Sequence, residues 1–289
     1  MNIPKKKHIL RKHNHTRNDP FFWLHKKNKK VMNIIDTSNQ QTNDFFDDTK
    51  SLQKQLIQEF KNRTFEYDKS IPTQYKHYYY HTIIKKNENY GRSFISKTKN
   101  DKGYCFFNPE KLSQKHTHFQ LGPLIISYNE TLLLYSVDYT GDLKYNLYCK
   151  NIFSNKITKE LPFEISNSYL FHPNNLSFYY IKYDTKIRPY QIWYHIIGDN
   201  VTNDILIYEE KNPEYWLDLS LSTDEKYIFI HSEAYENNHV TYIKDNIHVI
   251  DILPKKKNMN IQLITIKINS ISYQIKIKKK IFNYIHPLI

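Results

Sequence analysis

Residues 124–136 read LIISYNETLLLYS, in which two β-rich runs flank a short polar turn. The pattern returns as YLFHPNNLSFYYI at residues 169–181 and as LDLSLSTDEKYIFIH at residues 217–231. Runs of β-branched and aromatic residues around Asn, Asp, Pro or Glu predict a strand, a tight turn and a second strand in each copy. A third β-rich run follows every copy, at residues 145–150, 191–195 and 241–243.

The spacing of the copies indicates the architecture. Their turns, at Asn129, Asn174 and Asp224, lie 45 and 50 residues apart, and this is the period of a four-stranded propeller blade. Residues 75–115 supply a further unit, with strands predicted at 78–84 and 92–97. The predicted fold class is therefore all-β, a partial β-propeller of about four blades. A β-sandwich with an accidental repeat is the alternative.

Residues 1–74 differ from this pattern and are expected to form an N-terminal arm. Near its start, residues 18–24 (NDPFFWL) are a turn followed by an aromatic cluster that needs a partner surface. From Asp44 onward apolar residues recur at helical spacing, so we predict an amphipathic helix with Asp44 as its N-cap and Asp47 and Asp48 in its first turn. A linker is predicted at residues 64–72.

These patterns divide the chain into three segments: the helical arm at 1–74, the partial propeller at 75–260 and a tail at 261–289. The tail opens with IQLITIKINSI and continues into a lysine run, which breaks the preceding pattern. We expect this divergent tail to be out-of-frame or disordered sequence.

The glycine content excludes several classes of enzyme. The chain has five glycines, none within ten residues of another: Gly91, Gly103, Gly122, Gly141 and Gly198. A P-loop, a dinucleotide-binding fingerprint and the G-x-S-x-G elbow of hydrolases all need closely spaced glycines. The sequence contains none of these motifs, so we expect neither a glycine-rich phosphate-binding loop nor a nucleophilic serine in a G-x-S-x-G turn.

The net charge of +13 raises the question of a nucleic-acid partner. However, 29 acidic residues accompany the 42 basic ones along the chain. The dense basic runs are local, at residues 4–7, 26–30, 255–257 and 276–280. We interpret them as solvated surface and expect no specific nucleic-acid partner.

Cysteine usage and hydropathy indicate the compartment. Cys105 and Cys149 are too few for a disulfide framework, so we expect them to be reduced and buried. The basic N-terminus has no apolar segment behind it, and the longest apolar runs are far too short to span a membrane. We therefore expect a cytoplasmic protein without a membrane partner.

Three further stretches carry a family resemblance. They read HTRNDPFFWL at residues 15–24, DYTGDLKY at 138–145 and RPYQIWYHIIG at 188–198, the last continuing to LIYEEK at 206–211. Together they resemble the N-terminal half of oligopeptidase B enzymes, in the prolyl oligopeptidase family of serine peptidases. The resemblance runs from about residue 10 to about residue 257.

The resemblance implies a seven-bladed propeller that filters substrates by size above an α/β-hydrolase domain. Such enzymes are cytosolic, need no cofactor and cleave short peptides after Lys or Arg. Their Ser, Asp and His triad belongs to the hydrolase domain, against which the N-terminal arm packs.

The sequence lacks that hydrolase domain, so we expect a truncated or split-gene product that is inactive by itself. Its expected partners are a separately supplied hydrolase domain and short peptides. A non-catalytic propeller scaffold or an inert remnant is the alternative.

No residue is predicted to be catalytic, cofactor-binding or metal-ligating. His13 and His15 share one strand face, as do His116 and His118, but neither pair has a third ligand at a useful spacing. Four serines in predicted strands and turns lack flanking residues that suggest a base or an oxyanion hole: Ser127, Ser168, Ser222 and Ser232.

The remaining candidates have structural interpretations. Trp193 and Trp216 lie in strand patterns and are expected in the core of the blades. Asp138 and Asp142 bracket a turn, and turn chemistry accounts for both residues.

Overall fold

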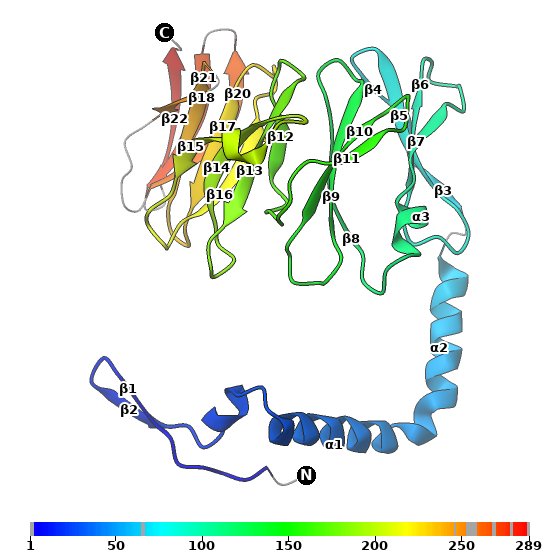
Figure 1. Ribbon diagram of the computed structural model, residues 1–289, viewed down its shortest axis with the longest axis vertical. Helices are drawn as coiled ribbons and strands as arrows, with labels where there is room; N and C mark the ends of the chain where they lie inside the picture. The colour runs from blue at the N-terminus through cyan, green and yellow to red at the C-terminus, as the bar shows by residue number, and fades with distance from the viewer. Residues whose placement is uncertain are drawn as a thin grey trace. The chain divides into compact units, whose positions relative to one another are not determined.

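The chain divides into two units, Met1–Glu66 and Tyr67–Ile289, in the computed structural model of Figure 1. The structure describes residues 3–64, 67–245, 247–252, 259–267, 270–277 and 280–287, the last three stretches by their backbone alone. The division falls before the boundary expected at residue 74, because part of the predicted linker pairs with the first long strand of the second unit.

The first unit begins with a hairpin of β1 (Ile9–Lys12) and β2 (His15–Asn18). The elements that follow are η1 (Phe22–His25), α1 (Lys29–Phe45), η2 (Asp47–Thr49) and α2 (Lys50–Arg63), where η marks a 3₁₀ turn. Asn28 precedes α1, and its side-chain oxygen accepts a hydrogen bond of 3.1 Å from the N–H of Val31. This bond satisfies one of the free N–H groups of the first turn, so Asn28 is the N-cap.

The predicted N-cap at Asp44 is wrong. Asp44 lies in the last turn of α1, where its Oδ1 accepts a hydrogen bond of 2.8 Å from Nε2 of Gln40. Asp47 and Asp48 belong to η2 instead of a first helical turn. The sequence interpretation failed because the apolar residues of α1 lie near its start, at Val31, Met32, Ile34 and Ile35, and the polar run at residues 36–44 separates them from Phe45.

The second unit contains consecutive antiparallel sheets, which we name blades 1 to 4. Blade 1 consists of β3 (Asp68–Lys69), β4 (Thr73–Tyr75), β5 (Tyr78–Ile84), β6 (Arg92–Ser96) and β7 (Tyr104–Phe107). Blade 2 consists of β8 (Gln120–Ile126), β9 (Leu132–Asp138), β10 (Asn146–Asn151) and β11 (Ile157–Lys159). The helix α3 (Pro109–Ser113) connects these two blades.

Blade 3 consists of β12 (Tyr169–Phe171), β13 (Ser177–Tyr183), β14 (Pro189–Ile196) and β15 (Ile205–Glu209), with the 3₁₀ turn η3 (Val201–Asn203) before β15. Blade 4 consists of β16 (Trp216–Leu221), β17 (Ile228–Glu233), β18 (Asn238–Lys244) and β19 (His248–Asp251). Strands that follow one another in the chain are neighbours in each of these two sheets. The three predicted hairpins and the third strand of each repeat are confirmed.

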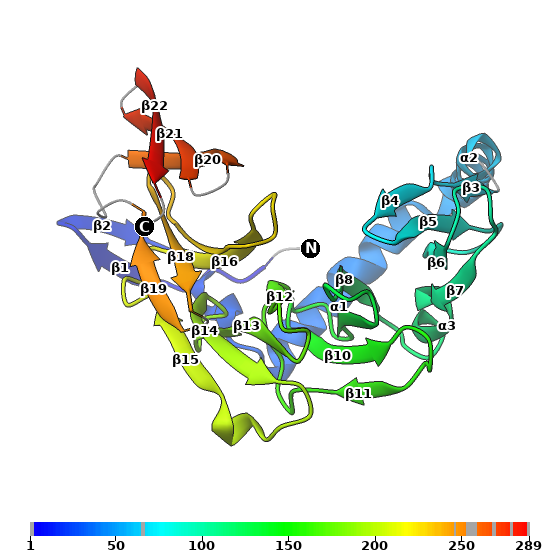
Figure 2. The ribbon, with the colours of Figure 1, turned by 90° about the horizontal axis from the view of Figure 1, so that it is seen from above.

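The hydrophobic core lies between consecutive blades, which follow one another in Figure 2. Leu133, Tyr135 and Val137 on one face of β9 pack with residues of blade 1. Leu134 on the other face packs with Tyr169 and other residues of blade 3. Successive side chains of a strand point to opposite faces, so β9 packs its own blade 2 against blade 1 on one side and against blade 3 on the other.

Strand β13 repeats this arrangement one blade further along the chain. Its Phe178 and Tyr180 pack with blade 2, whereas Tyr179 and Ile181 pack with blade 4. These side chains are almost completely buried, and each contributes about 1.5–3 kcal/mol through the hydrophobic effect. Alternating apolar side chains therefore hold the blades in order.

The chain after blade 4 has strand backbone in β20 (Met259–Lys267), β21 (Ser270–Ile277) and β22 (Lys280–Pro287), which form an antiparallel sheet in this order. Residues 261–289 were expected to be a divergent or disordered tail, so the strand backbone differs from that expectation. The stretch is rich in isoleucine, a residue with high β-propensity.

Candidate functional site

The turns that follow β4, β8, β12 and β16, one in each blade, approach one another. We name them the inner turns: residues 75–77, 127–130, 172–175 and 222–225. Three of them share a backbone conformation in which the last residue of the turn has a positive φ: Glu130 (56°), Asn175 (63°) and Glu225 (60°). The shorter turn of blade 1 has positive φ at Lys76 (46°).

The repeated residues of the sequence pattern build these turns. In blade 2, Oγ of Ser127 donates to Oδ1 of Asn129 (2.8 Å) and accepts from the N–H of Leu132 (2.9 Å). In blade 4, Ser222 and Asp224 make the corresponding bond of 2.7 Å. Short polar side chains that bind nearby backbone favour such turns. Ser127 and Ser222 therefore stabilise the backbone of their turns.

Glu130 joins the inner turns of blades 1 and 2. Its carboxylate is fully buried and accepts hydrogen bonds from the His77 N–H (3.1 Å) and from the Tyr80 hydroxyl (3.1 Å). Nδ1 of His77 lies 2.8 Å from the same carboxylate. Burial, together with the Glu130 carboxylate, raises the pKa of Tyr80, which keeps the phenol protonated as a donor.

Glu225 joins the inner turns of blades 4 and 1. Its carboxylate accepts a hydrogen bond of 2.7 Å from the Tyr75 hydroxyl and forms an ion pair of 2.7 Å with Nζ of Lys76. Burial alone would raise the pKa of Glu225, but the bonds from Lys76 and Tyr75 outweigh this effect and lower the pKa.

Two more bonds complete this set of contacts. Nζ of Lys76 donates to the Tyr128 carbonyl (3.2 Å), and the Asn129 N–H donates to Oδ1 of Asn175 (2.8 Å). The inner turns of all four blades are thus joined by hydrogen bonds and one ion pair. This inner-turn cluster is the candidate functional site. Glu130 and Glu225 occupy the same position of the sequence repeat, but the repeat does not show which residues of other blades their carboxylates bind.

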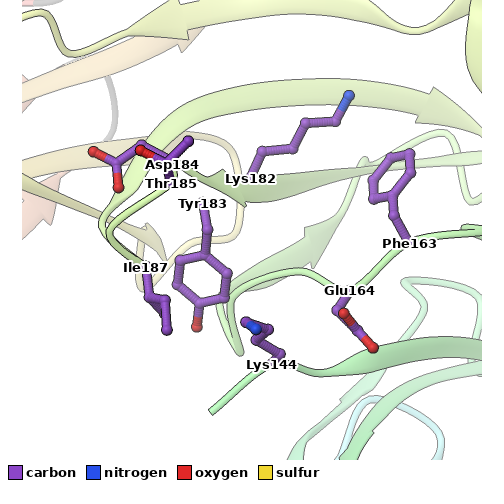
Figure 3. Close-up of a pocket in the computed structure, with 8 residues that line it drawn as sticks. All are labelled: Lys144, Phe163, Glu164, Lys182, Tyr183, Asp184, Thr185 and Ile187. Carbon is purple, nitrogen blue, oxygen red and sulfur yellow. The ribbon is translucent and has the colours of Figure 1, made fainter. Parts of the chain in front are cut away.

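A second feature is a cavity of about 500 Å³ between blades 2 and 3, shown in Figure 3. Lys144 and Glu164 lie on its blade 2 side, and Lys182 and Tyr183 lie on its blade 3 side. The Tyr183 hydroxyl donates to the Leu143 carbonyl (2.7 Å), which joins the two blades.

The lysines of this cavity already have partners. Nζ of Lys182 lies 4.0 Å from the ring centroid of Trp193 and 4.6 Å from that of Phe163, so aromatic faces stabilise the ammonium. Nζ of Lys144 pairs with Asp142 at 2.9 Å. The lining also carries two carboxylates, so the cavity offers no net charge to a ligand.

Arg188, the first residue of the RPYQIW stretch, donates hydrogen bonds to one carboxylate and to three backbone carbonyls. Its Nε donates to Oδ2 of Asp184 (3.0 Å). One terminal nitrogen donates to the carbonyls of Glu210 (3.2 Å), Asn212 (3.2 Å) and Tyr215 (2.9 Å). The planar guanidinium fits this fork of acceptors. Arg188 therefore holds the connection that leads from blade 3 to blade 4.

His195 of the same stretch lies between two carboxylates. Its Nδ1 is 2.6 Å from Asp204, and its Nε2 is 3.8 Å from Glu160. Burial alone would lower the pKa of His195, but both carboxylates outweigh it and raise the pKa. Tyr180 donates to the other oxygen of Asp204 at 2.6 Å, so the network ties blades 2 and 3 together.

Ser220 and His231 form a pair that the sequence did not suggest. Oγ of Ser220 lies 2.6 Å from Nε2 of His231 across strands β16 and β17. Burial lowers the pKa of His231. A nucleophilic serine also needs an orienting carboxylate and an oxyanion hole. In the part of the chain that the structure describes, the His231 ring donates no hydrogen bond to a carboxylate, and we assign this pair no catalytic role.

The structure corrects one expectation for the tryptophans. Trp193 is partly buried against the core between blades 2 and 3, as expected. Trp216 is 55% exposed, so its assignment to the blade core is wrong. It is the first residue of β16, and side chains at the end of a strand can escape the packing that buries the strand centre.

The remaining sequence candidates have structural surroundings. His13 has positive φ (51°) in the turn between β1 and β2, and the ring of His116 lies 4.0 Å from that of Tyr139. Oγ of Ser168 accepts a hydrogen bond of 3.0 Å from the Leu219 N–H. Ser232 is buried in β17. Among the described residues, no group of three metal-ligating side chains has a geometry that could hold a metal ion.

Both cysteines are free thiols: Cys149 is buried, and Cys105 is half-buried. Burial raises the pKa of Cys149 to about 12, so this thiol is unreactive. Within the described residues, no helix combines the length and the apolar character that a membrane crossing requires.

Comparison with known proteins supports the fold. In solved structures, the chain resembles oligopeptidase B from Leishmania major (TM-score 0.85, 18% identity, 98% of this chain and 44% of that chain). It also resembles oligopeptidase B from Trypanosoma brucei (TM-score 0.85, 19% identity, with the same coverage of 98% and 44%). At this level of identity the likeness shows the fold alone.

Curated relatives include Protease 2 of Moraxella lacunata, 20% identical over 254 residues, which are 83% of this chain and 35% of that protein. Dipeptidyl aminopeptidase BI of Pseudoxanthomonas mexicana is 21% identical over 253 residues, 80% of this chain and 35% of that protein. The chain thus spans about a third of the length of these relatives.

Residues 2–284 match the family of prolyl oligopeptidase N-terminal β-propeller domains. The match extends past residue 257, where the resemblance was expected to end, and covers most of the tail segment. Since nearly the whole chain is matched and its sheets form consecutive blades, the chain belongs to the N-terminal β-propeller domain family of the prolyl oligopeptidases.

Proposed function

We propose that the chain is the substrate-gating propeller of an oligopeptidase B-like serine endopeptidase, which acts on short peptides after Lys or Arg. The observation that carries this proposal is the inner-turn cluster, where Tyr75 and Lys76 of blade 1 bind Glu225 of blade 4. The innermost strands of a propeller surround its central axis, so the turns that leave these strands stand at one end of the axial passage.

A passage bordered by such turns would select substrates by width. An extended peptide is one strand wide, whereas a folded protein is much wider. The bonds of Glu130 and Glu225 tie the turns of neighbouring and opposite blades together, and a braced opening resists widening by a large substrate. Size selection would therefore depend on these two carboxylates.

The catalytic residues would come from a hydrolase domain, supplied by further sequence or by another chain. The sequence cannot form a G-x-S-x-G elbow, because its five glycines are too far apart. The first unit offers a surface for such a domain. Its helices expose large apolar side chains, among them Phe45, Phe46, Leu52, Ile57 and Phe60. Large exposed apolar side chains on consecutive elements favour a contact surface.

We propose the cytoplasm as the compartment, because the chain carries two free cysteines, Cys105 and Cys149. Thiols persist in the reduced form in that compartment. The proposed enzyme would need no cofactor, since serine peptidase chemistry uses protein groups alone.

The test combines the purified chain with a separately produced hydrolase domain from an oligopeptidase B relative. Fluorogenic peptides of increasing length, each with one Arg, serve as substrates. The chain alone should give no turnover and no labelling by a fluorophosphonate probe. With the hydrolase domain present, short peptides should be cleaved after Arg, and cleavage should fall as peptide length increases.

The double variant Lys76→Gln and Glu225→Gln should relax this length limit while leaving cleavage of the shortest peptide unchanged. Lys226→Gln is the matched control, because its side chain is largely exposed and its nearest carboxylate lies 3.9 Å away. If the hydrolase domain shows the same length dependence with and without the chain, the gating function is refuted. The chain would then be a non-catalytic propeller scaffold.

A further inference from the structure

A second cavity, of about 450 Å³, lies between the outer strands of blades 1 and 2, apart from the inner turns. Its polar lining comes from β7, α3, β10 and the loop before β11: Tyr104, Asn108, Lys111, Lys150 and Asn155. Figures 1 and 2 show β7 on blade 1, β10 and β11 on the neighbouring blade 2, and α3 on the connection that follows β7. The proposed gating function does not use this cavity.

Among the lysines whose burial the structure describes, Lys150 is unusual because it is 8% exposed. Its ammonium donates a hydrogen bond to the Phe106 carbonyl, and the nearest ring centroid, that of Phe107, is 6.0 Å away. Within the described residues, Lys150 forms no ion pair with a carboxylate. A buried ammonium without a counter-charge is costly, so burial lowers the pKa of Lys150.

The surroundings of Lys150 do not provide the missing negative charge. The cavity is lined by two lysines, Lys111 and Lys150, and by no acidic residue. The nearby carboxylate of Glu110 accepts hydrogen bonds from the N–H groups of Asn89 (2.9 Å) and Tyr90 (3.2 Å). In contrast to the cavity beside Lys182, this cavity therefore has a net positive lining.

We propose that this cavity binds a small oxyanion, with the ammonium groups of Lys150 and Lys111 as its charge partners. A carboxylate or a phosphate group supplies the acceptor oxygens that lysine prefers. The volume is large enough for such an ion together with a small organic group. The bound anion would also join the connecting helix α3 to blade 2, because Lys111 lies in α3 and Lys150 lies in β10.

The test is isothermal titration calorimetry of the full chain at constant ionic strength, with inorganic phosphate in one arm, succinate in a second and chloride in a control. We expect saturable binding at one site in at least one of the first two arms, and the stronger arm identifies the anion. Lys150→Gln should weaken binding about tenfold or more, since a charge-assisted hydrogen bond is lost.

Lys111→Gln provides a second variant that does not disturb the core, because Lys111 is exposed; it should weaken binding severalfold. Lys159→Gln is the charge control, since Lys159 is an exposed residue of β11 outside the cavity. Equal affinity in Lys111→Gln and the unaltered chain would overturn the proposal, as would an equal loss in Lys159→Gln.

A labelling experiment on the unaltered chain checks the site directly. Reductive methylation is followed by mass spectrometry, with Lys159 as the internal reference. The bound anion should slow the modification of Lys150 severalfold and leave that of Lys159 unchanged. If the titrations show no saturable binding and the anion does not slow the methylation of Lys150, the cavity is not an anion site.

Discussion

Tyr75 and Glu225 are 150 residues apart in the sequence, yet the Tyr75 hydroxyl donates a hydrogen bond of 2.7 Å to Oε1 of Glu225. Lys76 pairs with the other carboxylate oxygen at the same distance of 2.7 Å. The inner turn of blade 4 is thus attached to the inner turn of blade 1. Three of the predictions below concern contacts of this kind between blades.

Replacing Glu225 with Gln should lower the free energy of unfolding by about 1 kcal/mol, because it removes the ion pair with Lys76 and keeps only a neutral acceptor for Tyr75. Urea unfolding followed by circular dichroism measures the change. The neighbouring substitution Lys226→Gln should alter stability by less than about 0.5 kcal/mol. Equal losses in both variants would mean that Glu225 does not join the blades.

Replacing Glu130 with Ala should be more damaging, with a loss of about 3 kcal/mol. The change leaves the Tyr80 hydroxyl and the His77 N–H without the carboxylate that accepts their hydrogen bonds. A double-mutant cycle with Tyr80→Phe separates this contact from the general effect of truncation. Additive losses in the double variant would contradict a direct interaction between Glu130 and Tyr80.

Asp138 should make stability depend on pH in the acid range. Burial alone would raise its pKa, but the N–H groups of Thr140, Gly141 and Leu143 outweigh burial and lower the pKa. The stabilisation is present above the ordinary aspartate pKa of about 4 and is lost as the pH falls through the lowered folded value.

The substitution Asp138→Asn tests this behaviour in unfolding experiments between about pH 2 and pH 7. The variant should lose about 2 kcal/mol at neutral pH and show a flatter dependence below about pH 4. Asp36→Asn, at an exposed position of α1, is the control and should follow the unaltered chain. If the free energy of unfolding of Asp138→Asn depends on pH as steeply as that of the unaltered chain, Asp138 is not the source of the acid dependence.

Arg188→Lys should destabilise the chain by about 2–3 kcal/mol, although the charge is kept. A lysine ammonium cannot reach Asp184 and the three carbonyls together, so some of these acceptors between blades 3 and 4 lose their donor. Differential scanning calorimetry gives the shift in Tm. Arg63→Lys, in the exposed last turn of α2, should leave the Tm unchanged.

The exposed apolar residues of the helices should promote self-association of the isolated chain. The double variant Phe45→Ser and Phe60→Ser removes two large side chains that are 76% and 63% exposed, so it should shift the chain toward monomer. Analytical ultracentrifugation measures the distribution, and Tyr235→Ser, at a fully exposed loop position, serves as the control. Identical distributions in all three proteins would show that the helices do not mediate association.

The blades could be predicted from the sequence because their strands and turns are specified by residues that are close together in the chain. The repeat at 124–136, 169–181 and 217–231 combines alternating apolar residues with turn residues such as Asn129, and both signals act between neighbours in the chain. The start of α1 was missed because the polar run at residues 36–44 interrupts the helical period that Val31 and Ile34 begin, and because Asn28 was not recognised as the N-cap.

Only the tertiary structure decided which charges meet. The pairing of Glu225 with Tyr75 and Lys76, the fork of acceptors around Arg188 and the position of Lys150 without a carboxylate depend on how whole blades pack. The exposure of Trp216 at the end of β16 depends on that packing too. Local patterns specify strands and turns, whereas contacts between residues far apart in the chain arise when interdigitated side chains set the distance between sheets.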